Sequence, residues 1–147
     1  MPEEETTRSH LPAIRAVIDL VIKAIRTNDV DLFLSLCAPE VVVFDLIPPL
    51  EQRGLEAVRK AWLLSMGSFE GPIDYEIDRL DAQTGGDIAF SRCLAQFAAT
   101  TKEGTRIQSH VRSTLGFRRV NGNWKIVHEH LSVPFDANGQ GMFQLES

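Results

Sequence analysis

The chain has 147 residues, of which 44% are hydrophobic and 24% are charged. This length and composition are typical of one folded domain with a sizeable core, and they exclude a disordered chain. The net charge of −5 and the pI near 5.3 exclude nucleic acid and anionic membrane surfaces as expected partners.

The first part of the chain predicts three helices. Residues 1–10 are polar and acidic, and we expect this segment to be frayed or disordered. In residues 11–25 apolar side chains recur every three or four positions, which indicates an amphipathic helix of about four turns. Asp29 is a good N-cap for a short second helix that Pro39 would close, and a third helix is expected over residues 54–66.

A short buried strand is expected between the second and third helices. Residues 41–44 are β-branched or aromatic, which favours a strand, and Asp45 stands at its end. The next residues, 46–50, include two prolines and therefore predict a loop.

The remaining chain predicts a meander of long antiparallel strands. The candidate strands are residues 73–83, 88–101, 105–120 and 124–133, with glycine-containing turns between them. The two middle strands exceed the usual five or six residues, which indicates a strongly curved sheet. Helices followed by such a sheet predict an α+β fold with the helices on one sheet face.

The last predicted strand carries the strongest functional signal. Its residues alternate between two faces, as in any strand. One face is apolar at one end and polar at the other, which suits the floor of a pocket: Trp124, Ile126, His128, His130 and Ser132. Glu129 lies on the opposite predicted face, where we expect a dimer contact.

The turn at Asn121-Gly122 decides which residues of the preceding strand share that pocket face. A type I turn with a bulge pairs Thr114 with His128, Arg112 with His130, and His110 with Ser132. A two-residue type I′ turn would instead present Val111, Ser113, Leu115 and Phe117. We favour the bulged turn because it separates polar from apolar residues. A polar face that is merely solvated, or that forms an interface, is the alternative.

Several segments resemble the NTF2-like superfamily, and within it the SnoaL-like or ketosteroid-isomerase-homologue group. They are Phe44-Asp-Leu-Ile-Pro-Pro-Leu50, Phe69-Glu-Gly-Pro-Ile73, Arg112-x-Thr114 and Gly122-Asn-Trp-Lys-Ile-Val-His-Glu-His-Leu-Ser-Val-Pro-Phe135. The last segment also resembles the association domain of calcium/calmodulin-dependent protein kinase II, which assembles oligomers. The resemblance covers residues 11–136 and leaves a polar tail, 137–147. It implies a cone of three N-terminal helices on a strongly curved antiparallel or mixed sheet that encloses a pocket, commonly as a dimer.

The resemblance implies that Asp45 occupies the position of the general base in ketosteroid isomerases. An apolar cavity would raise the pKa of such a carboxyl toward neutrality. The alternative is a structural Asp45 that accepts backbone N–H bonds or pairs with Arg53 or Arg112. The oxyanion tyrosine on the first helix of those isomerases is replaced here by Val21, and Tyr75 is the only tyrosine.

The histidines offer two interpretations. His128 and His130 are expected as catalytic residues that orient the substrate, with Thr114 and Ser132 as hydrogen-bond partners. A metal site built from His110, these two histidines and Asp45 is the alternative, but no cysteine or acidic cluster supports it, so we expect no metal.

Arg112 is the clearest candidate for anchoring a ligand carboxylate or enolate, because a guanidinium binds such groups through two parallel hydrogen bonds. The alternative is an ion pair with Asp45 or Glu129. Aromatic side chains would form the apolar walls of the pocket: Trp62, Phe69, Tyr75, Phe90 and Trp124.

These residues lead to one hypothesis and one alternative. The chain is expected to bind a small apolar or anionic carbonyl compound and to transfer a proton on it, without a cofactor. It would act as a homodimer formed through the sheet face. The alternative is a non-catalytic ligand-binding or assembly module. No basic and apolar leader or membrane-length apolar run is visible, and Cys37 and Cys93 form no Cys-x-x-Cys pair, so we expect a cytoplasmic location.

Overall fold

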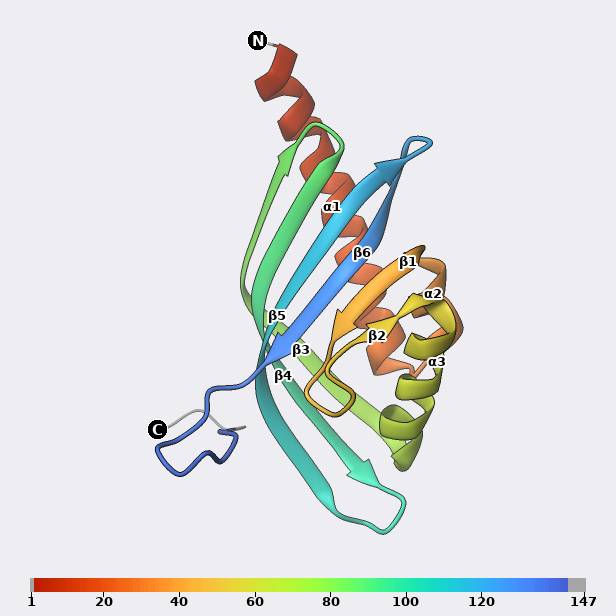
Figure 1. Ribbon diagram of the computed structural model, residues 1–147, viewed down its shortest axis with the longest axis vertical. Helices are drawn as coiled ribbons and strands as arrows, with labels where there is room; N and C mark the ends of the chain where they lie inside the picture. Colours follow the sequence, from red (N-terminus) through yellow and green to blue (C-terminus); the bar gives the residue numbers. More distant parts are fainter. Residues whose placement is uncertain (1, 143–147) are drawn as a thin grey trace.

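A curved, unclosed sheet of six strands carries three helices on one face (Figure 1). The computed structural model describes residues 2–142, with side chains described from His10 onward. The helices are α1 (Pro2–Arg26), α2 (Val30–Ser35) and α3 (Gly54–Ser65), followed by a 3₁₀ turn at Met66–Ser68. The strands are β1 (Cys37–Phe44), β2 (Gln52–Arg53), β3 (Phe69–Gly85), β4 (Ile88–Thr101), β5 (Arg106–Val120) and β6 (Asn123–Ser132). The predicted α+β class is confirmed.

The strand order is β2-β1-β6-β5-β4-β3. All neighbours are antiparallel except β1 and β6, which run parallel, so the sheet is mixed. β3 therefore lies at one free edge, and α1 packs along it. Arg26 of α1 donates a hydrogen bond from Nε to the backbone oxygen of Tyr75 at 2.9 Å, which satisfies one acceptor of that edge.

The helices form where the sequence predicts them, with different ends. α1 begins at Pro2, inside the segment expected to be frayed, and buries Ile14, Ile18 and Val21 against the sheet. Asp29 caps α2, since its carboxylate accepts the Leu32 N–H at 3.0 Å.

The second helix ends at Ser35, before Pro39, and β1 starts at Cys37 rather than at residue 41. Pro39 lies inside β1, where the predicted helix stop was placed. The pairing of β1 with β6 is irregular between Cys37 and Val42. A proline lacks the N–H that a regular ladder uses, and this interruption accommodates it.

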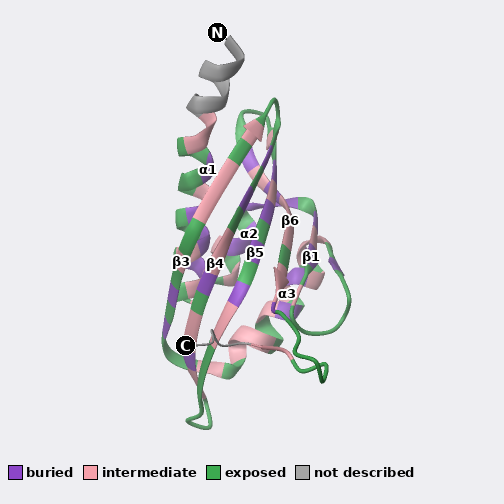
Figure 2. Cartoon of the chain, turned by 90° about the vertical axis from the view of Figure 1, so that its left-hand side faces the viewer, coloured by how far each residue is buried: buried purple, intermediate pink, exposed green. Residues whose placement is uncertain are grey.

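The core lies between the helices and the concave face of the sheet. Its largest fully buried side chains come from α1, β1, β5 and β6: Ile14, Val41, Phe117 and Ile126. Buried and exposed residues alternate along the long strands, as Figure 2 shows. One sheet face is therefore covered and the other is open; we call them the inner face and the outer face.

The β5–β6 hairpin corrects the predicted pairing. Asn121 and Gly122 both have positive φ, 51° and 80°, and Val120 pairs with Asn123, which defines a two-residue turn of the I′ kind. The bulge lies further along, because Phe117 pairs with Ile126 but Gly116 pairs with His128. Val127 is the extra residue, and it reverses which residues of β6 face inward.

The tail after β6 folds back in a small loop. Phe135 and Gly141 form an isolated bridge, and one carboxylate oxygen of Asp136 accepts the N–H groups of Asn138 and Gln140. The rest of the predicted polar tail, residues 143–147, lies outside the described residues.

Candidate functional site

The bulge places Glu129 on the inner face of the sheet. Glu129 pairs with Leu115 of β5 and with Val43 of β1, and both neighbours are buried in the core beneath the helices. The expectation that Glu129 would serve a dimer contact on the other face assumed unbroken alternation from Trp124. The extra residue at Val127 breaks that alternation.

The environment of Glu129 is unusual for a carboxylate. Protein surrounds it, and within residues 10–142 no hydrogen bond or ion pair reaches it, although it keeps some accessible surface. Burial, and to a smaller extent the negative charge of Asp45, together raise its pKa to about 7. Such a carboxyl exchanges its proton near neutral pH.

Asp45 is the second carboxylate of the inner face. It directly follows β1, and its carboxylate bonds to Gln52, the buried partner of Val43, which places it on the inner side. Strand spacing and rise place its Cα about 8 Å from that of Glu129. The Leu46 N–H donates to Asp45 Oδ1 at 2.7 Å, and Gln52 Nε2 donates to Oδ2 at 3.1 Å. Gln52 is only 3% exposed, so this second donor is fixed within the protein.

Tyr75 supplies a neutral hydroxyl near the Glu129 carboxylate. Burial raises the pKa of the Tyr75 phenol, and Cys93 and then Glu129 raise it further. The phenol therefore stays protonated and can only gain a partner as a donor, or as a weak acceptor. Val21, which the resemblance matches to the isomerase tyrosine, is buried in the core.

Two thiols complete the inner polar cluster. Burial and the charge of Glu129 raise the pKa of Cys93, whereas a hydrogen bond with Ser113 lowers it. Burial, with Glu129, raises the pKa of Cys37 to about 12. Both thiols are free and protonated at neutral pH, so neither acts as a thiolate nucleophile.

The six predicted polar ligands do share one face, but it is the outer one. The observed pairs are Gly116–His128, Thr114–His130 and Arg112–Ser132, two residues away from the predicted pairs. Arg112 is exposed and donates from Nε to the Ser132 hydroxyl at 3.0 Å, not to Asp45 or Glu129. His110 projects from the same side of β5 as Arg112.

An aromatic cluster on the outer face holds the histidine pair. Phe44 contacts both imidazoles edge-on, with ring centroids 4.7 Å from His128 and 5.4 Å from His130. His128 Nδ1 lies 2.6 Å from the backbone oxygen of Val42 and donates to it. The histidines and Asp45 lie on opposite faces, because Asp45 bonds to Gln52, the buried partner of the inner-face residue Val43.

The structure therefore does not assemble the alternative metal site. Within the described residues, no three His, Cys, Asp or Glu side chains come together as metal ligands. The histidine ring centroids lie 6.2 Å apart, with Asp45 on the other side of the sheet.

The predicted aromatic wall is divided in the same way. Tyr75 and Trp124 are buried on the inner face, and Trp62 packs on Phe33 at 5.2 Å between ring centroids. Phe69 stacks with Phe97 at 5.3 Å. Phe90 lies on the outer face and is 41% exposed.

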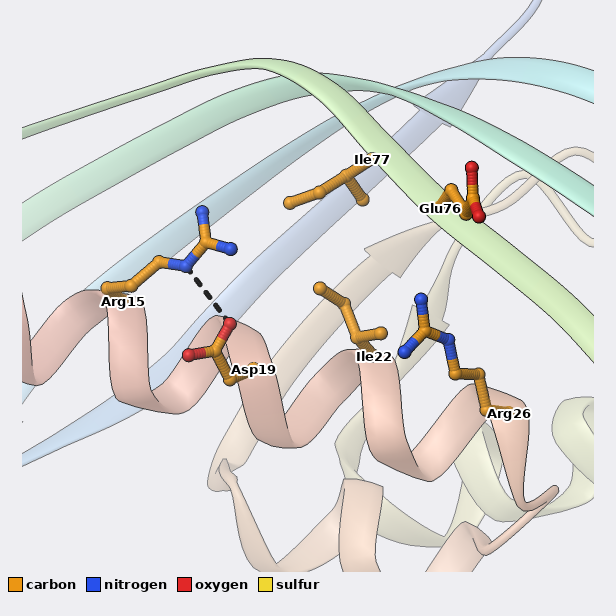
Figure 3. Close-up of a pocket in the computed structure, with 6 residues that line it drawn as sticks. All are labelled: Arg15, Asp19, Ile22, Arg26, Glu76 and Ile77. Atoms are coloured by element: carbon orange, nitrogen blue, oxygen red, sulfur yellow. Dashed lines mark hydrogen bonds and ion pairs between the residues drawn. The ribbon is translucent and has the colours of Figure 1, made fainter.

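A surface recess of about 480 Å³ lies between α1 and the free edge of β3 (Figure 3). Its lining is Arg15, Asp19, Ile22 and Arg26 of α1 with Glu76 and Ile77 of β3. Arg15 is paired with Asp19 at 3.0 Å. None of the predicted site residues lines this recess, although Ile22 and Ile77 pack against the buried cluster that contains Tyr75.

Sequence reasoning missed Glu129, Gln52 and Cys93 as inner polar residues, and it placed Ser113 on the pocket face only in the type I′ alternative, which is the turn observed. Only Gln52 had a sequence signal. It is a polar residue at the point where the chain returns from the proline-rich loop to the third helix and must pack against the domain. No sequence signal marked the bulge that turns Glu129 inward.

The chain belongs to the SnoaL-like domain family, whose sequence model matches residues 14–136. No curated protein matches it in sequence. An NTF2-like protein of unknown function from Pseudomonas putida KT2440 is 29% identical, with a TM-score of 0.86; the match covers 96% of this chain and 99% of that one. The predicted family and fold are confirmed.

Two more distant structures share the fold. A ketosteroid isomerase-like protein from Erwinia carotovora atroseptica SCRI1043 is 20% identical, with a TM-score of 0.73 over 84% of this chain and 95% of that one. A Xanthomonas campestris protein named for the calcium/calmodulin dependent protein kinase II association domain is 19% identical, with a TM-score of 0.71 over 81% and 84%. None of the described helices is long and apolar enough to cross a membrane. The cytoplasmic location stays a prediction.

Proposed function

We propose that this protein binds a small organic molecule on the inner face of the sheet and transfers a proton on it, with Glu129 as the base. The observation that carries the proposal is a surrounded carboxylate without a protein partner whose pKa lies near 7. A base with this pKa is half ionised at neutral pH, which balances availability against proton affinity.

Tyr75 is the electrophilic partner in this proposal. When Glu129 removes a proton from a carbon next to a carbonyl, the electron pair of that C–H bond moves to the carbonyl oxygen. The phenol of Tyr75 donates a hydrogen bond to the oxygen as its negative charge grows. Return of the proton from Glu129 to another carbon completes an isomerisation.

Asp45, the base that the resemblance implies, takes a second role. Its two protein donors hold it in place, and its charge raises the pKa of Glu129. The name of the ketosteroid isomerase-like neighbour agrees with this class of chemistry, whereas the fold alone supports many others.

The test is proton exchange on carbon. A panel of small ketones is incubated in D₂O with the protein, and loss of the α-proton signal is followed by NMR. We expect Glu129→Gln to lose nearly all exchange and Tyr75→Phe to lose about 10²–10³-fold. The control is Glu103→Gln, which removes one carboxylate in the exposed β4–β5 turn. If exchange is equal in wild type and Glu129→Gln across the panel, Glu129 is not the base.

A second function is favoured by the outer face. It exposes large apolar side chains in the open sheet, with Phe44 at 37%, Phe90 at 41% and Ile88 at 57%. We propose that two copies pair through this face and that His128, His130 and Arg112 belong to the contact. This is the assembly role expected as the alternative.

The oligomeric state tests the pairing. Sedimentation should show a dimer for wild type and a monomer for Phe90→Arg. Leu63→Arg is the matched control, because Leu63 is also an exposed apolar residue, at 56%, but lies on α3. A wild-type monomer, or a Phe90→Arg dimer, contradicts the outer-face interface.

A further inference from the structure

The inner polar cluster carries negative charge only. Its two carboxylates, Asp45 and Glu129, stand among neutral groups: Gln52, Tyr75, Cys93 and Ser113. The charge environment of this cluster therefore decides which small molecules can enter it.

No cation of the described chain balances these carboxylates. Within residues 10–142, neither Asp45 nor Glu129 forms an ion pair with a lysine, arginine or histidine. The influences on Glu129 are burial and Asp45, with no positive charge among them. Lys125, which acts on Cys37, donates its ammonium to the Ser35 oxygen at 2.8 Å.

The arginines of the sheet are engaged elsewhere. Arg92 lies 3.8 Å from Asp81, Arg118 pairs with Glu40, and Arg112 donates to Ser132. All three side chains are exposed on the outer face. An anionic ligand beside Asp45 and Glu129 would thus meet two carboxylates that, among the described residues, no cation pairs with.

Asp45 retains acceptor capacity for a ligand. A carboxylate offers about four lone-pair positions, and the Leu46 N–H and Gln52 amide occupy one on each oxygen. Asp45, at the end of β1, and Glu129 are each partly exposed, so both carboxylates keep accessible surface.

We infer that the inner site takes a small molecule with a protonated amine, held by Asp45 while its reacting carbon lies beside Glu129. The inference rests on the proposed function and names its substrate class, a small amino carbonyl compound. It replaces the anionic ligand expected from the sequence, since the arginine expected to anchor that ligand lies on the outer face. Gln52 is a positioning residue in this arrangement, because it fixes the Asp45 carboxylate.

Three probes of one shape and different charge test the inference: benzylammonium, benzyl alcohol and benzoate. Each is titrated into the full chain at constant ionic strength, about one pH unit above the Glu129 pKa, and binding is read from NMR shifts. We expect benzylammonium to bind at least about tenfold tighter than benzyl alcohol, with benzoate weakest.

Two variants assign the preference to a residue. Asp45→Asn should weaken benzylammonium by about tenfold and leave benzyl alcohol unchanged, whereas Glu103→Gln should change neither. Equal affinities, tighter benzoate, an unchanged preference in Asp45→Asn, or no saturable binding of benzylammonium each overturn the inference. The proposed function fails separately, when Glu129→Gln leaves carbon-proton exchange intact, whatever charge the probes prefer.

Discussion

Glu129 and Asp45 project from the neighbouring parallel strands β6 and β1 onto the same helix-covered face, two residues out of direct register. Two negative charges at this separation repel each other more strongly when protein shields them from bulk water. Burial and the charge of Asp45 together raise the pKa of Glu129 to about 7. The site therefore contains a carboxylic acid, Glu129, that titrates near neutral pH.

The stability of the protein should fall as the pH rises through this range. The carboxyl of Glu129 ionises near pH 4.5 in the unfolded chain and near pH 7 in the folded one. Between these values the folded state binds more protons, so acid favours folding, and up to about 3 kcal/mol is lost by the time the pH passes 7. Urea unfolding at a series of pH values measures this loss.

Glu129→Gln is the matched variant for that experiment, because its amide cannot ionise. The variant should become progressively more stable than wild type from pH 4.5 to pH 7. The other titrating groups are the same in both proteins, so their contributions cancel in the difference in unfolding free energy. A difference that stays constant over this window means that the Glu129 pKa is ordinary.

Asp45→Asn should lower the pKa of Glu129. The substitution removes the negative charge that disfavours ionisation of Glu129 and leaves burial in place, so the pKa should remain above 4.5. A ¹³C-detected titration of the Glu129 carboxyl measures the shift. No downward movement in Asp45→Asn means that the two carboxylates are not electrostatically coupled.

Tyr75→Phe should separate catalysis from folding. The described residues form no hydrogen bond with the Tyr75 hydroxyl, so its removal should change the unfolding free energy by less than about 1 kcal/mol. The carbon-proton exchange rate should nevertheless fall about 10²–10³-fold, mainly in kcat. Equal losses of stability and activity would point to a packing role alone.

Asn28 should be hard to replace, because it joins three elements. Trp62 Nε1 donates to its side-chain oxygen at 2.9 Å, and its amide donates to the Met66 oxygen at 2.8 Å. Its φ of 51° also lies in the left-handed region. Asn28→Ala loses both bonds and strains the backbone, so we expect a loss of about 2–4 kcal/mol in unfolding free energy.

Asn28→Gly is the comparison that divides this loss. Glycine adopts the positive φ freely, so its variant should be about 1 kcal/mol more stable than Asn28→Ala. Chemical denaturation of both variants provides the values. If glycine is no better than alanine, the backbone conformation at this position carries no cost.

Most of the fold follows from local patterns. The apolar period of residues 11–25 locates the first helix and its end, although α1 begins earlier, at Pro2, and the glycine turns place the long strands within a few residues. The β1 start was missed because Pro39 usually ends an element, and only its irregular pairing with β6 lets it sit within a strand. Such an accommodation depends on a partner strand that is distant in sequence.

The candidate site was harder to predict, for one physical reason. Side chains in a strand alternate between the two faces of the sheet, so one extra residue moves every later side chain of that strand to the other face. The predicted bulge was right in kind but was placed at the turn, whereas it lies at Val127. Asp45 and Tyr75 were identified as candidates, but Glu129 was assigned to the wrong face.

The covered edge of β3 has a further consequence for how copies of this protein can meet. A long edge strand invites another chain to extend the sheet, which leads to open-ended polymers. Here α1 runs beside that edge, Arg26 occupies the Tyr75 carbonyl, and Arg79 breaks the regular strand with a φ of 54°. These features oppose growth of the sheet from its β3 side. Contact through the broad outer face remains available, and a two-fold pairing of that kind is closed rather than endless.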